Sequence, residues 1–558
     1  MEERIWHRSY APGVPRSIDY EKVTIPQALS RSARDYPYKT ALNYMGKKIC
    51  YAELERLVNR FSRALSALGI RPGDKVAVSL PNIPQVVIAN LAIFRIGAVT
   101  VQNNPLYTER ELAYQINDSD SRCVITLSLL VPRMQNLLAK TKLQMIVSCD
   151  LHAFLPFPKK QLFPYVKKEM YRKVKPDNKV CLFGDLIRQH PGDPVEDMSR
   201  WEDLAALLYT GGTTGVGKGV MLSHANLSCN VQQFVAWFPG LKTGEERLVG
   251  TFPIFHSAGF TAVQNFMVWQ AWETILVPRP EPKGLIEILK KEKPGWLPGV
   301  PTIFVGLLAD PEFRKMNLSF IKGFFSGAAP LSAETLRDLK ELTGATMCEV
   351  YGMTETTPIA TVTPFGGKIK PGTVGVPVSD TELKIVDLET GTREMKIGEE
   401  GEVAIKGPQV MMGYYKKPAE TAAVLKDGWL YTGDIGLLDE EGYLRVVDRK
   451  KDMIIAGGYN IYPVEIDGVL MEHPKILQAC AIGVPDSYRG ETVKAFVVPK
   501  PGESLDKEEV MNHCKKRLAA YKLPKAVEIV TELPLSTVGK VLRRKLRDME
   551  MEKAKKGG

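Results

Sequence analysis

The chain has 558 residues, of which 44% are hydrophobic and 25% are charged, and its formal net charge is +10. A chain of this length is too long to fold around a single hydrophobic core, so we predict two or more domains. The composition is that of an ordinary globular protein. No apolar run is as long as a membrane span, the N-terminus lacks a signal-peptide pattern, and the eight cysteines include no C-x-x-C pair. We therefore expect a cytoplasmic protein with reduced cysteines and no cysteine–histidine metal cluster.

Helical and strand-like periodicities alternate from about residue 25 to residue 130. Apolar residues at helical spacing favour helices, and short apolar runs between turn residues favour strands. The predicted elements are helices at 51–68, 84–96 and 109–117 and strands at 75–80, 98–102 and 123–127. This alternation through short connections is typical of a mainly parallel sheet covered by helices.

The positive charge is partly concentrated in residues 151–180, where cations are interleaved with aromatic side chains. The cations are Lys159, Lys160, Lys167, Lys168, Arg172, Lys173, Lys175 and Lys179, against only Glu169 and Asp177. Each basic residue beside an anionic membrane surface contributes roughly 1 kcal/mol of binding. The segment therefore predicts either peripheral membrane contact or an ordinary solvated insertion. No aromatic–basic motif typical of a nucleic-acid binder is present, so we do not expect nucleic acid as a partner.

A glycine-rich stretch, Tyr209-Thr-Gly-Gly-Thr-Thr-Gly-Val-Gly-Lys-Gly219, separates two predicted strands at 204–208 and 220–222. Its glycines let backbone N–H groups approach an anion, its threonines add donors and Lys218 adds a positive charge, so it predicts a phosphate-binding loop. A Walker A loop is one alternative, because Gly212 to Lys218 fits the spacing. However, Gly219 stands where that motif needs a serine or threonine, and a strand-like run follows in place of a helix. A purely structural turn is the other alternative.

The alternating pattern resumes after the loop, with helices predicted at 226–238 and 282–291 and strands at 248–253, 273–277 and 321–325. From residue 375 to 415 the chain becomes strand-rich, with strands at 382–386 and 401–406, which predicts a small β subdomain.

The charged stretch Asp448-Arg-Lys-Lys-Asp452 precedes a tail with its own pattern. Strands are predicted there at 477–484, 492–498 and 526–530, and helices at 507–518 and from about 541. We predict the α/β fold class: a large N-terminal domain, residues 1–450, of helix-covered mainly parallel sheets plus a β subdomain, and a small α+β C-terminal domain, residues 451–558.

The glycine-rich stretch resembles the phosphate loop of the adenylate-forming superfamily, which includes acyl-CoA synthetases, luciferases and adenylation domains. Its Gly-Gly variant resembles the bacterial long-chain fatty acid–CoA ligases in particular. Five further stretches follow in the order of that superfamily, and the resemblance extends over nearly the whole chain. It implies that the loop contacts a nucleotide through Thr210, Gly211, Gly212, Thr213, Thr214, Gly215 and Lys218.

The stretch Pro253-Ile-Phe-His-Ser-Ala-Gly259 contains a histidine beside an apolar strand. Taken alone, such a histidine is most often a satisfied core residue. In the superfamily that the chain resembles, the matching histidine lies between the acyl pocket and the nucleotide. The resemblance therefore implies a catalytic position for His256 and a place in the pocket wall for Phe260, although core packing would give the same sequence pattern.

The turn Ser326-Gly-Ala-Ala-Pro330 follows a predicted strand, and small residues at such a carboxyl end leave room for a planar base. Many strand–helix turns share this composition. By resemblance, Gly327, Ala328 and Ala329 pack on adenine.

The stretch Glu349-Val-Tyr-Gly-Met-Thr-Glu355 joins a glycine turn to a hydroxyl and a carboxylate. Magnesium takes hard oxygen ligands together with phosphates, so a carboxylate in a turn of small residues suits it. The resemblance implies that Glu355 and Thr210 hold Mg²⁺ and that Thr354 contacts the phosphates. It also places Glu349, Tyr351 and Gly352 at the nucleotide.

Two later stretches complete the set. Asp434, at the end of Asp427-Gly-Trp-Leu-Tyr-Thr-Gly-Asp434, would by default cap a turn. Lys540, in Ser536-Thr-Val-Gly-Lys-Val-Leu-Arg-Arg544, would by default lie on a solvated basic face. The resemblance gives other roles: Asp434 and Arg449 contact the ribose, Lys540 is a mobile catalytic lysine, Lys451 is the hinge, and the acyl-transfer step uses Gly457, Gly458 and Tyr459.

The resemblance implies a two-step reaction of ATP, Mg²⁺, a carboxylic acid and coenzyme A. A carboxylate is a poor electrophile, whereas AMP is a good leaving group for the thiol of coenzyme A. We therefore expect an acyl-adenylate intermediate and a long-chain fatty acid as the acid. Medium-chain or aryl acids, and a binding homologue without turnover, remain alternatives. The sequence leaves the oligomeric state open, a homodimer included.

Overall fold

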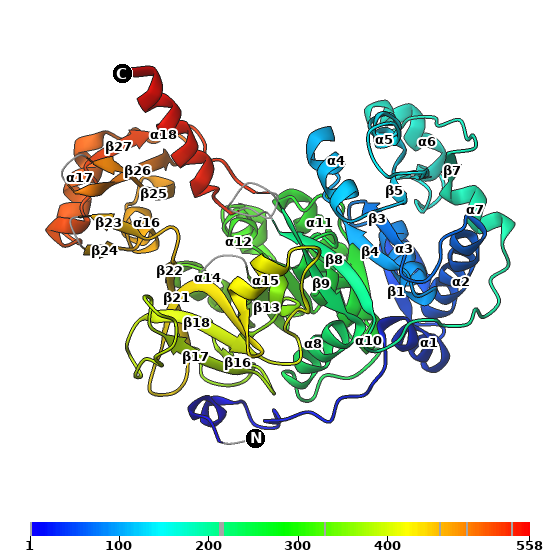
Figure 1. The fold of residues 1–558 in the computed structure, drawn as a ribbon, viewed down its shortest axis with the longest axis horizontal. Helices are drawn as coiled ribbons and strands as arrows, with labels where there is room; N and C mark the ends of the chain where they lie inside the picture. The colour runs from blue at the N-terminus through cyan, green and yellow to red at the C-terminus, as the bar shows by residue number, and fades with distance from the viewer. Residues whose placement is uncertain are drawn as a thin grey trace. The chain divides into compact units, whose positions relative to one another are not determined.

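The computed structural model describes residues 3–210, 217–327, 331–456, 459–486, 489–536 and 540–557. Two compact units make up the chain: the first is Met1–Glu382 with Lys406–Leu430, and the second is Leu383–Ile405 with Tyr431–Gly558 (Figure 1). The domain boundary predicted at residue 451 is the point about which the C-terminal domain is expected to rotate, and it stays a prediction. Among the described residues, no helix combines the length and the apolarity that crossing a bilayer requires.

An eight-stranded sheet in the first unit has the strand order β19-β9-β8-β4-β3-β5-β6-β7. From β8 to β7 the neighbours pair in parallel, and β9 and β19 add antiparallel strands at one edge. Ile116 of α4 (Glu109–Asp118) and Met134 of α5 (Val131–Leu138) pack against Val124 and Ile146 of this sheet. The strands are β3 Lys75–Ser79, β4 Val99–Gln102, β5 Cys123–Leu127, β6 Met145–Cys149, β7 Val180–Leu182, β8 Leu204–Thr210, β9 Lys218–Ser223 and β19 Gly413–Tyr414.

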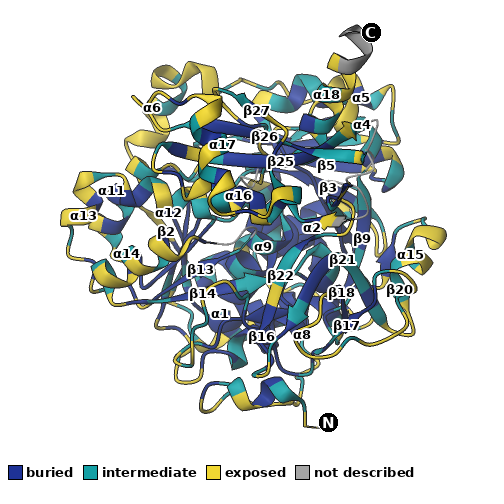
Figure 2. Ribbon diagram, turned by 90° about the vertical axis from the view of Figure 1, so that its left-hand side faces the viewer, coloured by how far each residue is buried: buried dark blue, intermediate teal, exposed yellow. Residues whose placement is uncertain are grey.

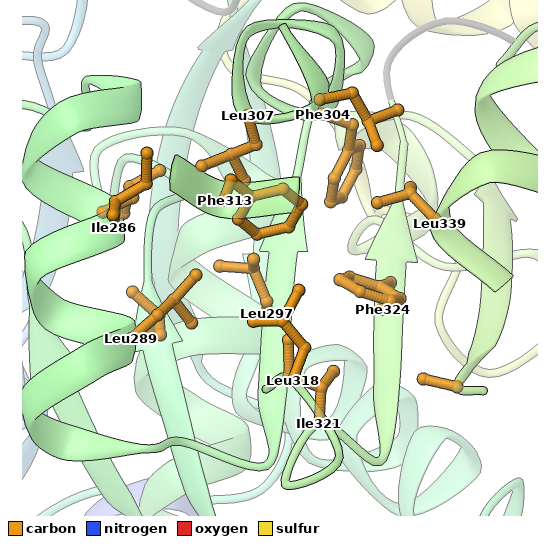
Figure 3. Close-up of a cluster of buried hydrophobic side chains, with 14 of the residues drawn as sticks. Ile286, Leu289, Leu297, Phe304, Leu307, Phe313, Leu318, Ile321, Phe324 and Leu339 are labelled. Carbon is orange, nitrogen blue, oxygen red and sulfur yellow. The ribbon is translucent and has the colours of Figure 1, made fainter. Parts of the chain in front are cut away.

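A nine-stranded sheet in the same unit has the order β16-β15-β14-β13-β12-β10-β11-β1-β2, parallel from β14 to β1. Figure 3 shows Leu289 of α11 and Phe304 of α12 directed at Leu297 and Phe324 of two neighbouring strands. The strands are β1 Thr40–Tyr44, β2 Lys47–Cys50, β10 Arg247–Gly250, β11 Glu273–Leu276, β12 Trp296–Gly299, β13 Gly323–Ser326, β14 Thr346–Tyr351, β15 Thr361–Val362 and β16 Val376–Pro377.

Helix α3, Pro84–Arg95, is buried along its whole length. Its apolar residues lie on all sides rather than on one face, as expected of a helix that is covered all round. Buried polar side chains need partners, and two of those in α3 show theirs. The Asn90 amide donates to Gln264 at 2.8 Å, and Arg95 forms an ion pair with Glu55 at 2.9 Å.

The helices of the first unit connect the strands of the two sheets (Figure 1). They are α1 Ile25–Asp35, α2 Tyr51–Ala67, α3, α4 Glu109–Asp118, α5 Val131–Leu138, α6 Lys159–Val166, α7 Phe183–Gln189, α8 His224–Ala236, α9 Ser257–Gly259, a π-helix Phe260–Asn265, α10 Phe266–Gln270, α11 Pro282–Glu292, α12 Pro301–Leu308, α13 Pro311–Lys315, α14 Ala333–Thr343 and α15 Pro418–Val424.

Two five-stranded sheets complete the fold. One has the order β17-β18-β21-β20 with β22 beside β21, and the other, within the second unit, has β24-β23-β26-β25 with β27 parallel to β26. Ile466 of α16 and Val510 of α17 pack on one face of the latter sheet, and Leu546 of α18 packs on Phe496. The elements are β17 Glu382–Val386, β18 Gly401–Lys406, β20 Leu425–Lys426, β21 Trp429–Leu438, β22 Leu444–Arg449, β23 Ile454–Ala456, β24 Tyr459–Ile461, α16 Pro463–Met471, β25 Ile476–Asp486, β26 Gly490–Pro499, α17 Lys507–Lys515, β27 Ala526–Ile529 and α18 Arg543–Gly557.

The predicted α/β fold class is confirmed: helix-covered, mainly parallel sheets precede a smaller, strand-rich C-terminal part. The helices and strands predicted from the sequence are present, with ends shifted by a few residues. The sequence did not reveal that residues 257–270 are helical, because their mixture of small, aromatic and β-branched residues shows no clear 3.6-residue period.

Candidate functional site

The predicted phosphate loop connects two antiparallel strands, β8 and β9. Thr210 and Lys218 are directly opposite each other at the end of this pair. Gly211, Gly212, Thr213, Thr214 and Gly215, which the sequence assigns to the same loop, lie outside the described residues. The base of the loop is held by two phenols: the Tyr209 hydroxyl donates to Asp118 at 2.7 Å, and the Tyr114 hydroxyl donates to the Gly217 carbonyl at 3.1 Å. The threonine and the lysine therefore lie at one end of the β8–β9 pair, where the base of the loop is anchored.

The histidine stretch and the Thr354–Glu355 turn, nearly a hundred residues apart, are neighbours in the first unit. The Ser257 and Thr354 hydroxyl oxygens are 3.3 Å apart. His256 precedes α9, and its Nδ1 accepts from the Ala258 N–H at 3.3 Å. The structure therefore brings His256, Thr354 and Glu355 into one region of the first unit.

Tyr414 is a member of this region that the sequence analysis missed. Its hydroxyl donates to Glu355 Oε1 at 2.8 Å, and the Lys218 ammonium lies 4.4 Å from the centre of its ring. Its side chain is buried, and in β19 it pairs with Val220 of β9. The phenol therefore joins a carboxylate to a lysine that is distant in sequence. No local pattern reveals this contact, because it depends on the pairing of β19 with β9.

The turn around Gly352 positions the predicted adenine-side residues. A Cβ atom at Gly352 would lie 1.7 Å from the Pro358 carbonyl oxygen, so only glycine fits there. Glu349 is buried at the end of β14 and accepts a hydrogen bond from the Leu331 N–H at 3.3 Å. Burial raises the pKa of Glu349 to about 7. Tyr351 is half-buried in the same strand.

Two other predictions concern the neighbourhood of this turn. Gly327 follows β13, and an added Cβ there would meet the Val350 carbonyl oxygen at an ordinary contact distance of 3.6 Å. Ala328 and Ala329 lie outside the described residues. Phe260 is fully buried in the π-helix and meets Phe94 edge-to-face, with ring centres 6.0 Å apart. Its predicted place in an acyl pocket stays a prediction.

The second unit contains the predicted ribose and lysine positions. Asp434 and Arg449 are opposite each other in β21 and β22, with Nε 2.7 Å from Oδ1. Lys540 lies near both groups: desolvation and then the Arg449 cation lower its pKa, while Asp434 acts in the opposite direction. Beside them is an open cavity of about 300 Å³, lined by Thr432, Gly433, Arg449, Lys450 and Lys451. This grouping offers cations and one carboxylate to a sugar-phosphate.

The residues on either side of Lys451 have different partners within the second unit. Lys450 pairs with Glu402 of β18 at 3.1 Å, whereas Asp452 pairs with Arg547 of α18 at 2.7 Å. Desolvation and the Arg449 cation lower the pKa of Lys451 to about 8. The change of partners at this residue is compatible with a hinge. Gly457 and Gly458 lie outside the described residues, and only the backbone of Tyr459, the first residue of β24, is described.

The donor set around Glu355 fits magnesium. Besides the carboxylate, it offers the hydroxyls of Thr354 and Ser257, and these hard oxygens are the ligand type that Mg²⁺ prefers. Tyr414 occupies one carboxylate oxygen as a donor, which orients the carboxylate. Among the described residues no group of three or more histidine, cysteine or acidic side chains that could hold a metal ion is present.

Comparison with known proteins identifies the family of the chain. The family model described as "AMP-binding enzyme" matches residues 29–415, and the model described as "AMP-binding enzyme C-terminal domain" matches residues 465–540. The chain belongs to the AMP-binding enzyme family. The superfamily inferred from the motifs is therefore confirmed, and Lys540 is the last residue of the C-terminal match.

Two named proteins match this AMP-binding enzyme over nearly its whole length. The chain is 42% identical to a long-chain-fatty-acid–CoA ligase of Bacillus subtilis (strain 168), covering 99% of both chains. It is 36% identical to the protein of the same name in Escherichia coli O157:H7, covering 98% of both.

Solved structures give the same fold. ATP-bound MatB from Rhodopseudomonas palustris aligns with a TM-score of 0.84 at 31% identity, covering 94% of this chain and 99% of that one. The anthranilate CoA ligase AuaEII, in complex with anthranoyl-AMP, aligns with a TM-score of 0.85 at 27% identity, covering 96% and 98%.

Proposed function

We propose that this AMP-binding enzyme activates a long-chain fatty acid with ATP to an acyl adenylate and then transfers the acyl group to coenzyme A, releasing pyrophosphate and AMP. The observation that supports the first step is the grouping of Lys218, Tyr414 and Glu355 beside Thr354. The names of the two long-chain-fatty-acid–CoA ligases, which match the chain over its whole length, support the substrate.

In the first step an oxygen of the fatty acid carboxylate bonds to the α-phosphorus of ATP, and the bond to pyrophosphate breaks. Negative charge accumulates, so fixed cations and donors accelerate the step. Lys218 and the hydroxyls of Thr210 and Thr354 would bind the phosphates. When bound with ATP, Mg²⁺ supplies further positive charge, and Glu355 and Thr210 would hold it. His256 would lie between the nucleotide and the acid.

Lys540 would neutralise the carboxylate and the α-phosphate while they react. Desolvation and the Arg449 cation lower the pKa of Lys540, and Asp434, which with Arg449 is a proposed ribose contact, acts in the opposite direction. In the second step the thiol sulfur of coenzyme A bonds to the acyl carbon, and AMP leaves with the electrons of the cleaved C–O bond. That step needs access for the thiol where Lys540 acted, so we propose a rotation about Lys451 between the two steps.

A second candidate is the same chemistry on an aryl or medium-chain acid. The structural similarity to an anthranilate CoA ligase supports it, at a lower identity than that of the long-chain ligases. We further propose a cytoplasmic enzyme in peripheral contact with the inner face of the cell membrane through residues 151–180.

The test is pyrophosphate and AMP release by the purified chain with ATP, Mg²⁺ and coenzyme A. The acids are acetate, octanoate, palmitate, oleate and 4-coumarate. We expect the highest kcat/KM with palmitate or oleate. A preference for octanoate or 4-coumarate would favour the second candidate, and release of ADP and phosphate would refute the acyl-adenylate mechanism.

Lys540→Ala tests the role of the lysine. The first step, measured as acid-dependent ATP–pyrophosphate exchange, should slow by about 100- to 1000-fold, the effect of losing one charge-stabilising group. Acyl transfer from a supplied acyl adenylate to coenzyme A should persist. Lys545→Ala, an exposed lysine on α18, is the matched control and should leave both steps unchanged. Equal losses in both steps would contradict a role confined to the first.

A further inference from the structure

Asp448, in the stretch that contains the proposed pivot Lys451, is a buried carboxylate whose two oxygens both accept backbone N–H groups. Only 3% of the residue is exposed. Its Oδ1 accepts from the Arg449 N–H at 2.7 Å, and its Oδ2 accepts from the Val464 N–H at 2.8 Å. The first bond is local, whereas the second joins a residue before Lys451 to a residue after it. The proposed reaction has so far assigned no role to this carboxylate.

The bond to Val464 caps helix α16 from outside the helix. Val464 is the second residue of α16, and Tyr462, the residue at the N-cap position, provides no side-chain cap. The first N–H groups of a helix have no partner within it, so an acceptor there stabilises the helix, and a negative charge also interacts favourably with the helix dipole. Since Pro463 has no N–H, that of Val464 is the first that α16 presents. Asp448 therefore supplies, across the pivot, a cap that α16 itself lacks.

A second contact crosses the pivot at the same end of α16. Tyr462 has a side-chain hydrogen bond with Glu400, and burial, followed by this bond, raises the pKa of the tyrosine. Glu400 directly precedes β18, so it belongs, like Asp448, to the part of the second unit that comes before Lys451 in the chain. A rotation at residue 451 that carries the C-terminal part away would separate the partners of both bonds, because they lie on opposite sides of the pivot in the sequence.

From α16 a series of contacts leads to the segment of the proposed mobile lysine. Helix α16 has a buried face and an exposed face (Figure 2), and Asp467 lies on the buried face. Asp467 forms an ion pair with Arg543, whose Nε donates to the Ala481 carbonyl of β25 at 3.3 Å. Shortly before Arg543, the Ser536 N–H donates to the Lys540 carbonyl at 2.7 Å, and the Lys540 N–H donates to the Ser536 hydroxyl at 3.0 Å. The lysine segment is therefore anchored to α16.

We infer that Asp448 is a positioning residue for Lys540: by capping α16 it stabilises the arrangement in which the lysine serves the first step, and its bond to Val464 breaks before acyl transfer. This role deepens the proposed function and rests on it, because the two steps are assigned to two arrangements of the second unit. A hydrogen bond present in only one of two arrangements shifts the ratio of their populations. The loss of one helix cap on a charged acceptor corresponds to about tenfold.

The experiment compares the two half-reactions of the full-length enzyme: acid-dependent ATP–pyrophosphate exchange, and acyl transfer from a supplied acyl adenylate to coenzyme A. Asp448→Ala removes the acceptor that caps α16. Because each rate scales with the population of its own arrangement, the ratio of the exchange rate to the transfer rate should fall by about tenfold. A purely structural loss would lower both rates together and leave this ratio unchanged. The melting temperature verifies the fold of each variant.

Tyr462→Phe is a second variant, which keeps the ring and removes the hydroxyl that bonds to Glu400. The same ratio should fall by about threefold, since one hydrogen bond across the pivot is lost. This milder change decides the question if Asp448→Ala does not fold.

Matched controls lie on either side of the pivot. Asp439 accepts N–H groups at 2.9 and 3.0 Å within the turn between β21 and β22, before Lys451. Asp506 caps α17 through the Glu509 N–H at 2.8 Å, after Lys451. Asp439→Ala and Asp506→Ala each remove an acceptor of backbone N–H groups without touching a contact across the pivot, so both should keep the ratio of the unchanged enzyme.

The positioning role is overturned if every folded variant of Asp448 and Tyr462 keeps the ratio of the unchanged enzyme. It is also overturned if Asp439→Ala or Asp506→Ala lowers the ratio as much as Asp448→Ala does. The absence of acid-dependent exchange in the unchanged enzyme would instead refute the proposed function, and the positioning role with it.

Discussion

Tyr414 connects two charged side chains that the proposed first step requires. Its hydroxyl holds one oxygen of Glu355, and the face of its ring attracts the Lys218 ammonium. Because all three residues belong to the first unit, this contact does not depend on the second unit. Tyr414 therefore acts as a positioning residue for both the proposed magnesium carboxylate and the proposed phosphate lysine.

Tyr414→Phe removes the hydroxyl and keeps the ring, so Glu355 loses its orienting donor while Lys218 keeps its cation–π contact. Loss of one hydrogen bond to a charged group should weaken binding of Mg²⁺–ATP by about tenfold or more. Isothermal titration calorimetry measures this, and the melting temperature verifies the fold. Tyr415→Phe is the control, since the Tyr415 hydroxyl donates to Asp120 instead. Unchanged Mg²⁺–ATP affinity in Tyr414→Phe would exclude the positioning role.

Glu349 should make the stability of the first unit depend on pH. Its pKa is raised from 4.5 to about 7 by burial, so the folded state binds the proton more tightly than the unfolded state. As the pH rises from 4.5 to 7 the unfolded carboxyl ionises first. The free energy of unfolding should therefore fall by roughly 3 kcal/mol over this window and then level off.

Glu349→Gln removes the titrating group and tests this dependence. Its melting temperature relative to the unchanged protein should increase between pH 4.5 and 7 and stay constant above pH 7. Glu341→Gln, at a side chain that is 70% exposed on α14, should show no such trend. A difference that is independent of pH would show that Glu349 ionises normally.

At the scale of elements, local periodicity predicted most of the first unit. Helix α2 has apolar residues at helical spacing, and strands such as β5 are short apolar runs, so a window of a few residues identified them. The π-helix Phe260–Asn265 was missed because a π-helix lacks the 3.6-residue period. The fold class followed from the alternation, whereas the order of the strands in each sheet did not.

Pairings between distant strands explain what the sequence left open in the site. Tyr414 reaches Glu355 only because β19 pairs with β9, almost two hundred residues earlier in the chain. Asp434 and Arg449 were each proposed from motifs, and their ion pair follows from the register of β21 and β22. Such registers depend on tertiary packing, which no single stretch encodes.

Gly259 shows how an element boundary is fixed by close packing. A Cβ atom there would lie 2.1 Å from the Pro253 carbonyl oxygen, so the last residue of α9 lies directly against the preceding turn. Gly259→Ala should destabilise the protein by about 1–3 kcal/mol, the usual result of overpacking, and displace His256. Gly284→Ala in α11, where an added Cβ meets nothing within 4 Å, should instead stabilise by about 0.5–1 kcal/mol. Thermal unfolding of the two variants should show these opposite signs, and equal shifts would contradict the packing argument.

At the scale of the whole molecule, the proposed reaction makes two opposing demands on Lys540. The first step needs its charge at the nucleotide, and the second needs that space for the thiol of coenzyme A. In the second unit Asp434 and Arg449 form an ion pair and both act on the pKa of Lys540, and the proposed first step places this lysine beside them. One rigid site cannot satisfy both demands, so the reaction requires a change in backbone conformation between them.

Lys451→Pro tests the position of this change. Proline at residue 451 fixes φ near −65° and so restricts rotation of the backbone there. Because the arrangement around Lys540 suits the first step, ATP–pyrophosphate exchange should stay within about threefold of the unchanged enzyme. Acyl transfer from a supplied acyl adenylate to coenzyme A should fall by about 100-fold, since the rotation is blocked.

Lys451→Ala removes the side chain and leaves the backbone free, so both steps should remain near their original rates. If alanine impaired acyl transfer as much as proline does, the side chain of Lys451 would be the requirement, and the pivot would have to lie elsewhere. If proline slowed neither step, no rotation about residue 451 would be needed between them.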